Sequence, residues 1–123
     1  MSFLCPDCST AGTLKIVSRL ELPPDSRSDE ITLQIVQCSR CGFEGIAVYE
    51  ESRRGAMGGE SVDHRGYYVS ESDLQELKQQ MKKCPSPRNA RCACAVHRRL
   101  GGKDASGRWD GLADIETARR FVI

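Results

Sequence analysis

The sequence predicts a small α+β fold that depends on bound metal, with an N-terminal three-stranded antiparallel sheet followed by a helical module. Three observations support this prediction. Seven of the 123 residues are cysteine and only 6% are aromatic, which leaves little material for one conventional core. Apolar and polar residues alternate in the first 52 residues, as in strands, whereas a helical pattern lies near residue 77. Modules this small usually need metal or disulfides, because burial scales poorly with short length.

Three segments of the N-terminal region are predicted as strands, because they alternate apolar and polar side chains. They are residues 13–22, 30–37 and 43–52. One face of the first strand is expected to carry its apolar residues Leu14, Ile16, Leu20 and Leu22. The segment 23–29 holds two prolines and two aspartates, which is typical of a turn, so the first two strands are predicted to form a hairpin.

Composition divides the chain into four parts. Residues 1–52 form the sheet module, and residues 53–69 are a glycine-rich loop that ends in a short strand. Residues 70–103 form the helical module, and residues 104–123 are a tail whose apolar residues have helical spacing. We therefore expect two small modules joined by a loop.

The clearest helix begins after Ser70, which is the predicted N-cap, with Asp73 as a capping-box variant. Its apolar residues follow at helical spacing and are predicted to be buried; they are Leu74, Leu77 and Met81. Pro85 and Pro87 would stop this helix. A second short helix is predicted for residues 93–100, before two consecutive glycines.

Two Cys-x2-Cys pairs, Cys5 with Cys8 and Cys38 with Cys41, are separated by 29 residues. Each pair can direct two thiolates at one ion, and two pairs complete a tetrahedron. Clustered cysteines in a reducing compartment indicate metal ligands before disulfides. The spacing therefore predicts one structural zinc ion on these four cysteines, with Gly42 in a tight turn after the second pair.

The order of a CPDC unit, a hairpin, a CSRCGF unit and a third strand resembles the zinc-ribbon superfamily over about residues 3–52. The resemblance implies a zinc-stabilised ribbon but no single function. The RSDE stretch at 27–30 is also similar to the acidic hairpin tip of RNA polymerase transcript-cleavage factors. That similarity implies a role for Asp29 and Glu30 in holding a catalytic metal. The family's following proline is Ile31 here, and this hairpin is longer.

Rubredoxins, which hold iron for electron transfer, also place two cysteine pairs at about this distance. The stretch from Ser9 to Gln37 contains no aromatic residue, whereas the rubredoxin pattern carries an aromatic core there. The two knuckle signatures also occur in reversed order. We therefore expect zinc at this site, with a rubredoxin-like iron carrier as the alternative.

A second ligand set follows the helix and consists of Cys84, Cys92, Cys94 and His97. Three thiolates and one imidazole make a complete zinc set, and Cys94 and His97 could share one helical turn. These residues use the three cysteines that the first site leaves over, so we predict two zinc ions per chain. Ordinary buried thiols are the alternative for this set. His64 could also replace one of the ligands.

Charge is distributed unevenly along a chain whose net charge is +1. Residues 1–52 hold four Lys or Arg against eight Asp or Glu, and this acidic region is expected to meet a protein partner. Residues 84–103 hold no acid and five basic residues, which are Arg88, Arg91, Arg98, Arg99 and Lys103. Such a patch could contact nucleic-acid phosphates or another acidic surface. A solvated face, or a surface that docks on the acidic region itself, is the alternative.

Several function classes are disfavoured by the sequence. No apolar run is long enough to cross a membrane and no secretory signal is recognisable, so we expect a cytoplasmic protein. The GAMGGE stretch lacks the Lys-Ser/Thr ending of a phosphate-binding loop. No small-molecule substrate is indicated. We expect a non-enzymatic zinc-binding adaptor in transcription or another nucleic-acid process, with an enzyme accessory using Asp29 and Glu30, or His64, as the alternative.

Overall fold

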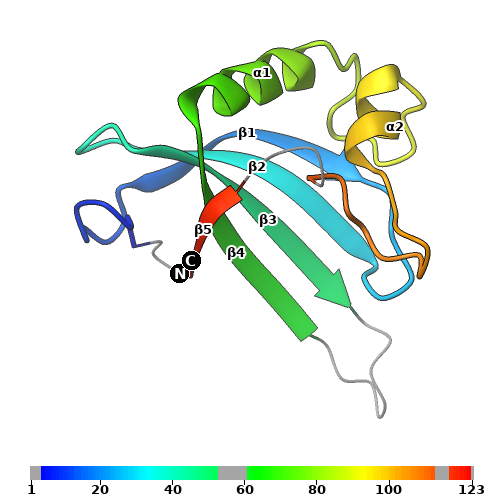
Figure 1. Ribbon diagram of the computed structural model, residues 1–123, viewed down its shortest axis with the longest axis horizontal. Helices are drawn as coiled ribbons and strands as arrows, with labels where there is room; N and C mark the ends of the chain where they lie inside the picture. Colours follow the sequence, from blue (N-terminus) through cyan, green and yellow to red (C-terminus); the bar gives the residue numbers. More distant parts are fainter. Residues whose placement is uncertain (1–3, 53–60, 113–116, 123) are drawn as a thin grey trace.

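A computed structural model describes residues 4–52, 61–112 and 117–122. Its strands form one antiparallel sheet in the order of the sequence, with α1 and α2 on one side of it (Figure 1). The strands are β1 (Leu14–Leu22), β2 (Glu30–Cys38), β3 (Glu44–Ser52), β4 (Ser61–Val69) and β5 (Thr117–Val122). The helices are α1 (Glu71–Lys82) and α2 (Ala95–Leu100).

The sheet is larger than the three strands that the sequence predicts, because it continues through β4 and then β5. Residues 61–65, which were expected in a loop, pair with β3 as part of β4. The rest of that expected loop, residues 53–60, lies outside the described part of the chain. In the tail that was predicted to be helical, residues 117–122 instead form a strand on β4, and residues 113–116 lie outside the described part of the chain.

An aromatic cluster explains why the tail forms a strand. The Phe121 ring forms edge-to-face contacts with Phe43 and Tyr68, with ring centroids 5.7 and 5.2 Å apart. The same ring covers Gly66, where an added Cβ would come within 2.2 Å of it. Packing between residues distant in sequence therefore overrides the local helical pattern.

The first strand does not keep its apolar residues on one face, because a β-bulge shifts the register between Ile16 and Ser18. Before the bulge, Leu14 and Ile16 pack in a small cluster with the first cysteines. After it, Leu20 and Leu22 belong to the main core on the helical side. One extra residue reverses the face of every later side chain, which a period-two pattern cannot reveal.

Both helices pack on the same core as the N-terminal strands. Ser70 is the N-cap of α1 and accepts a hydrogen bond from the Asp73 N–H at 3.2 Å, as predicted. The predicted helix face is buried and joins residues of β1, β2 and β3 in one hydrophobic cluster. The segments expected to form separate modules therefore share this cluster. In the described residues, no helix has the length and hydropathy needed to span a membrane.

Candidate metal centres

The first predicted ligand set converges beside the start of β1 and the end of β2, with all four sulfurs within 4.8 Å of one another. The Sγ atoms of Cys5 and Cys41 are 3.6 Å apart, and those of Cys8 and Cys38 are 3.7 Å apart. These distances exclude a disulfide, whose sulfurs lie about 2.05 Å apart. Four sulfurs about 2.3 Å from a central ion would be about 3.8 Å apart. The cluster is therefore compatible with a zinc-ribbon-like metal site.

The two Cys-x2-Cys units have the same backbone fold, which brings their thiols to one point. The Ser9 N–H donates to the Cys5 carbonyl at 2.9 Å, and the Gly42 N–H donates to the Cys38 carbonyl at 3.0 Å. Ser9 and Gly42 have positive φ angles of 58° and 79°. Glycine adopts this left-handed conformation without strain, so the predicted tight turn at Gly42 is confirmed.

The second predicted set also converges, with the ligand atoms of Cys84, Cys92, Cys94 and His97 within 4.8 Å of one another. His97 Nδ1 lies 3.1 Å from Cys84 Sγ and 3.4 Å from Cys94 Sγ. Cys94 is the N-cap of α2, and its Sγ accepts the His97 N–H at 3.4 Å. The two residues therefore share the first helical turn, as the spacing predicted. The four donors fit a metal ion that takes soft thiolate and imidazole ligands.

The orientation of the His97 ring suits metal binding. Its Nε2 lies 2.9 Å from the carbonyl oxygen of Glu21 on β1. A carbonyl can only accept a hydrogen bond, so Nε2 carries a proton, and Nδ1 is the ring nitrogen that faces the thiols and would serve as the metal ligand. Such support from a backbone carbonyl commonly fixes the tautomer of a metal-binding histidine. It also ties the second cluster to the sheet, because His97 is buried at this contact.

Hydrogen bonds make some thiols easier to ionise than others. A contact of 3.2 Å with the Thr13 hydroxyl, followed by the Cys41 N–H, lowers the pKa of Cys38. The N–H of His97 lowers the pKa of Cys94 in the same way. Burial raises the pKa of Cys84. A cation at the centre of each cluster would favour the thiolate at every position.

The five basic residues of the segment 84–103 are all exposed. Arg91 and Arg98 line a shallow hollow of about 310 Å³, together with Cys92 and His97 of the second cluster. Arg99 is turned toward α1, where its Nη1 lies 3.7 Å from Glu76 Oε1. The structure thus places two cationic side chains directly beside the second ligand set.

Carboxylates of the acidic N-terminal region are partly neutralised by cations from later elements. The ion pairs are Asp25 with Arg108 at 2.7 Å, Glu50 with Arg65 at 2.6 Å, and Glu44 with Lys78. None of these cations belongs to the segment 84–103. The exposed acidic surface is therefore smaller than the composition of residues 1–52 indicates.

The residues predicted for an accessory active site do not belong to the cysteine clusters. Asp29 and Glu30 stand at the beginning of β2, where the Asp29 N–H donates to the Glu51 carbonyl at 2.8 Å. His64 lies on β4 with its Nε2 2.7 Å from Gln34 Oε1, and burial lowers its pKa. None of the three belongs to either ligand cluster found in the described residues.

Two residues that contact the metal-ligand side chains were not predicted from the sequence. Thr13 acts on Cys38 through its hydroxyl, and Glu21 acts on His97 through its backbone carbonyl. The position of Thr13 just before the start of β1, close in sequence to the first cysteine pair, is the sequence feature that could have indicated its role. A carbonyl contact carries no side-chain signature, so no sequence pattern could have indicated Glu21.

Comparisons with known proteins give no relative for this chain: no family model, curated protein or solved structure matches it. The geometry of the two clusters is therefore the observation that bears most directly on function.

Metal binding by the second cluster predicts that replacing the two histidines of the chain, His97 and His64, changes the metal content differently. His97→Ala removes one of four ligands, so the variant should retain one fewer metal ion per chain than the unmodified protein. His64→Ala, the matched control, should keep the full metal content, because His64 belongs to neither ligand set in the described residues. Elemental analysis after dialysis measures both. Equal metal content in the two variants would contradict the assignment of His97.

Proposed function

We propose that this chain is a non-enzymatic interaction module whose fold is held by two structural zinc ions. The observation that supports this function is the convergence of two complete sets of four ligand atoms. Four protein ligands fill a tetrahedral zinc site and leave no position for a substrate or an activated water. At the second cluster, the Cys3His set is a common structural zinc set and differs from the rubredoxin site, which has four cysteines, as the first cluster does.

The two zinc ions would fasten opposite ends of β1. The first would join the N-terminal Cys5–Cys8 turn to the end of β2, next to Leu14. The second would join α2 to the segment before it, and the hydrogen bond from His97 would connect both to Glu21, near the other end of β1. Apparent binding free energies of structural zinc are about 10–16 kcal/mol in zinc-finger peptides, so each ion could stabilise a small fold substantially.

The identity of the metal is directly testable. Protein purified under reducing conditions should contain two zinc ions per chain and be colourless, because zinc has a filled d shell. Elemental analysis and a visible absorption spectrum measure these properties together. Iron with thiolate-to-metal absorption bands would contradict the proposal and favour the electron-carrier alternative.

We further propose that the module binds an acidic partner, such as a nucleic-acid backbone, through Arg91 and Arg98. Both side chains are exposed, and they line the same hollow beside the second cluster. A zinc ion there would hold the backbone of the neighbouring Cys92 and His97 and so fix the spacing of the two guanidinium groups. No aromatic residue lies in the segment 84–103, so contacts with phosphates would carry little sequence preference.

Charge-matched variants test this surface. Arg91→Gln with Arg98→Gln should weaken binding to a labelled oligonucleotide duplex. It should also reduce the steepness of the slope of log affinity against log salt concentration by about 2, since two phosphate contacts are lost. Lys15→Gln with Arg19→Gln, on exposed positions of β1, removes the same charge and should leave the slope unchanged. Fluorescence anisotropy across a salt series gives both slopes. Equal slopes in the two variants, or no salt-dependent binding, would refute this part of the proposal.

A further inference from the structure

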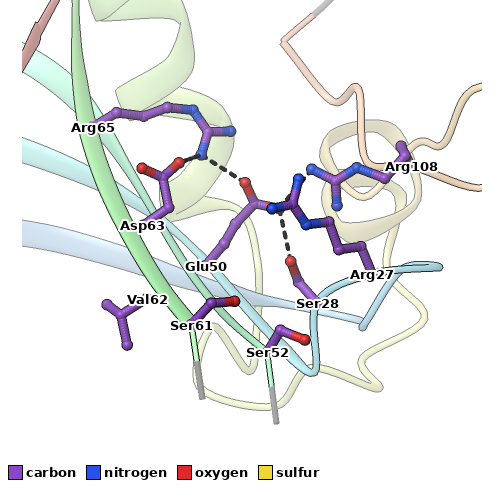
Figure 2. A pocket seen from close by; sticks show the side chains of 9 residues that line it. All are labelled: Arg27, Ser28, Glu50, Ser52, Ser61, Val62, Asp63, Arg65 and Arg108. Atoms are coloured by element: carbon purple, nitrogen blue, oxygen red, sulfur yellow. Dashed lines mark hydrogen bonds and ion pairs between the residues drawn. The ribbon is translucent and has the colours of Figure 1, made fainter. Parts of the chain in front are cut away.

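A polar pocket of about 460 Å³ lies on the helical side of the sheet, apart from both cysteine clusters (Figure 2). It is lined by Arg27, Ser28, Glu50, Ser52, Ser61, Val62, Asp63, Arg65 and Arg108. These residues come from the β1–β2 turn, the end of β3, the start of β4 and the segment after α2. The volume suits a small molecule, and the lining is almost entirely polar or charged.

Strand register places the floor of the pocket on the same face as the hydrophobic core. Val48 of β3, a core residue, is paired with Arg65 of β4, and Glu50 is paired with Asp63. The next pair on this face is Ser52 with Ser61. On β3 and β4 the core therefore ends at Val48, and the residues of these two strands beyond it on this face are polar, whereas Ile31 of β2, which is paired with Glu50, still belongs to the core. A face that needed only to be covered would favour apolar residues, so its polarity calls for another explanation.

Buried carboxylates hold two of the arginines in place. Glu50 accepts the Arg65 Nη1–H at 2.6 Å and lies 3.4 Å from Arg108 Nη2. Asp25 Oδ2 accepts Arg108 Nη1–H at 2.7 Å and the Trp109 N–H at 2.8 Å. Burial alone would raise the Asp25 pKa, but these donors and the N–H groups of the turn lower it, so the anchor is ionised. Both guanidinium groups are thus fixed before any ligand arrives.

Donors remain available in the pocket. A guanidinium group has five N–H donors, and the bonds described for Arg65 use its Nε and Nη1 but not Nη2. The exposed Arg27 side chain makes no ion pair within the described residues, and it extends toward Glu50 beside Arg108 (Figure 2). Three arginines and two carboxylates line the pocket, and the Asp25 carboxylate bound to Arg108 adds a third, so cationic and anionic side chains around the pocket are equal in number.

We propose that this pocket binds a small phosphate monoester whose remaining part carries hydroxyl groups. Guanidinium groups match the geometry and charge of phosphate, and Arg27 and Arg108 would hold that group at one side of Glu50. Asp63 and Ser61 lie toward β4, on the other side, and can hydrogen-bond to hydroxyls. The nearly complete lack of apolar lining disfavours a hydrophobic ligand. The site is independent of the zinc ions and of the Arg91–Arg98 surface.

Glycerol phosphate serves as the probe, titrated into the isotopically labelled full chain at constant ionic strength. Amide NMR shifts should saturate and cluster in the turn 25–28 and in the residues around Glu50 and Asp63. Arg27→Gln should weaken binding about tenfold or more, which is the usual effect of losing a hydrogen bond to a charged group. Arg27 is exposed and supports no described side chain, so this variant should fold normally.

Two controls separate this site from general attraction by positive charge. Arg19→Gln removes an exposed arginine of β1 and should retain full affinity, as should the variant with both Arg91→Gln and Arg98→Gln. The absence of saturable shifts would overturn the proposal. An unchanged affinity in Arg27→Gln would overturn it as well, and so would shifts confined to the neighbourhood of Arg91 and Arg98.

Discussion

The buried contact between His97 and Glu21 joins the chemistry of the second cluster to the main sheet. The imidazole of His97 contacts sulfurs through Nδ1 and the β1 backbone through Nε2. One side chain therefore links α2, the segment before it and β1. Cys84, at the other end of that segment, reaches the same point from the end of α1. A metal ion at this junction would hold the end of α1, the segment after it and the start of α2 together. The Glu21 N–H also donates to the Pro87 carbonyl at 2.8 Å, so β1 contacts this segment at a second point.

The first cluster acts at the other end of β1 and on a smaller set of neighbours. Its buried cysteines pack with Leu14, Val36 and Ala47, on the face opposite the helices. The bulge in β1 makes this arrangement possible, because it lets one strand supply apolar residues to both faces. The two clusters therefore pack against opposite faces of one sheet. The helices share the main hydrophobic cluster with the N-terminal strands, and the first cysteines pack in a second, smaller one.

The sequence allowed both ligand sets to be predicted, because metal ligands must carry particular atoms at restricted spacing. The cap at Ser70 and the buried face of α1 followed from equally local chemistry. What could not be predicted depends on distant partners. The tail forms a strand because Phe121 packs over Gly66, and the bulge in β1 becomes visible only when β2 pairs with it. The charged pocket joins residues as far apart as Arg27 and Arg108, which no local pattern connects.

If metal held by the two clusters maintains this fold, the amide NMR spectrum should change when a strong chelator removes the metal under reducing conditions. We expect the dispersed spectrum of a folded chain to collapse as the metal leaves, and to return when two equivalents of zinc are added. A dispersed spectrum that persists in metal-free protein would contradict the claim, because the sheet and helices would then be stable through packing alone.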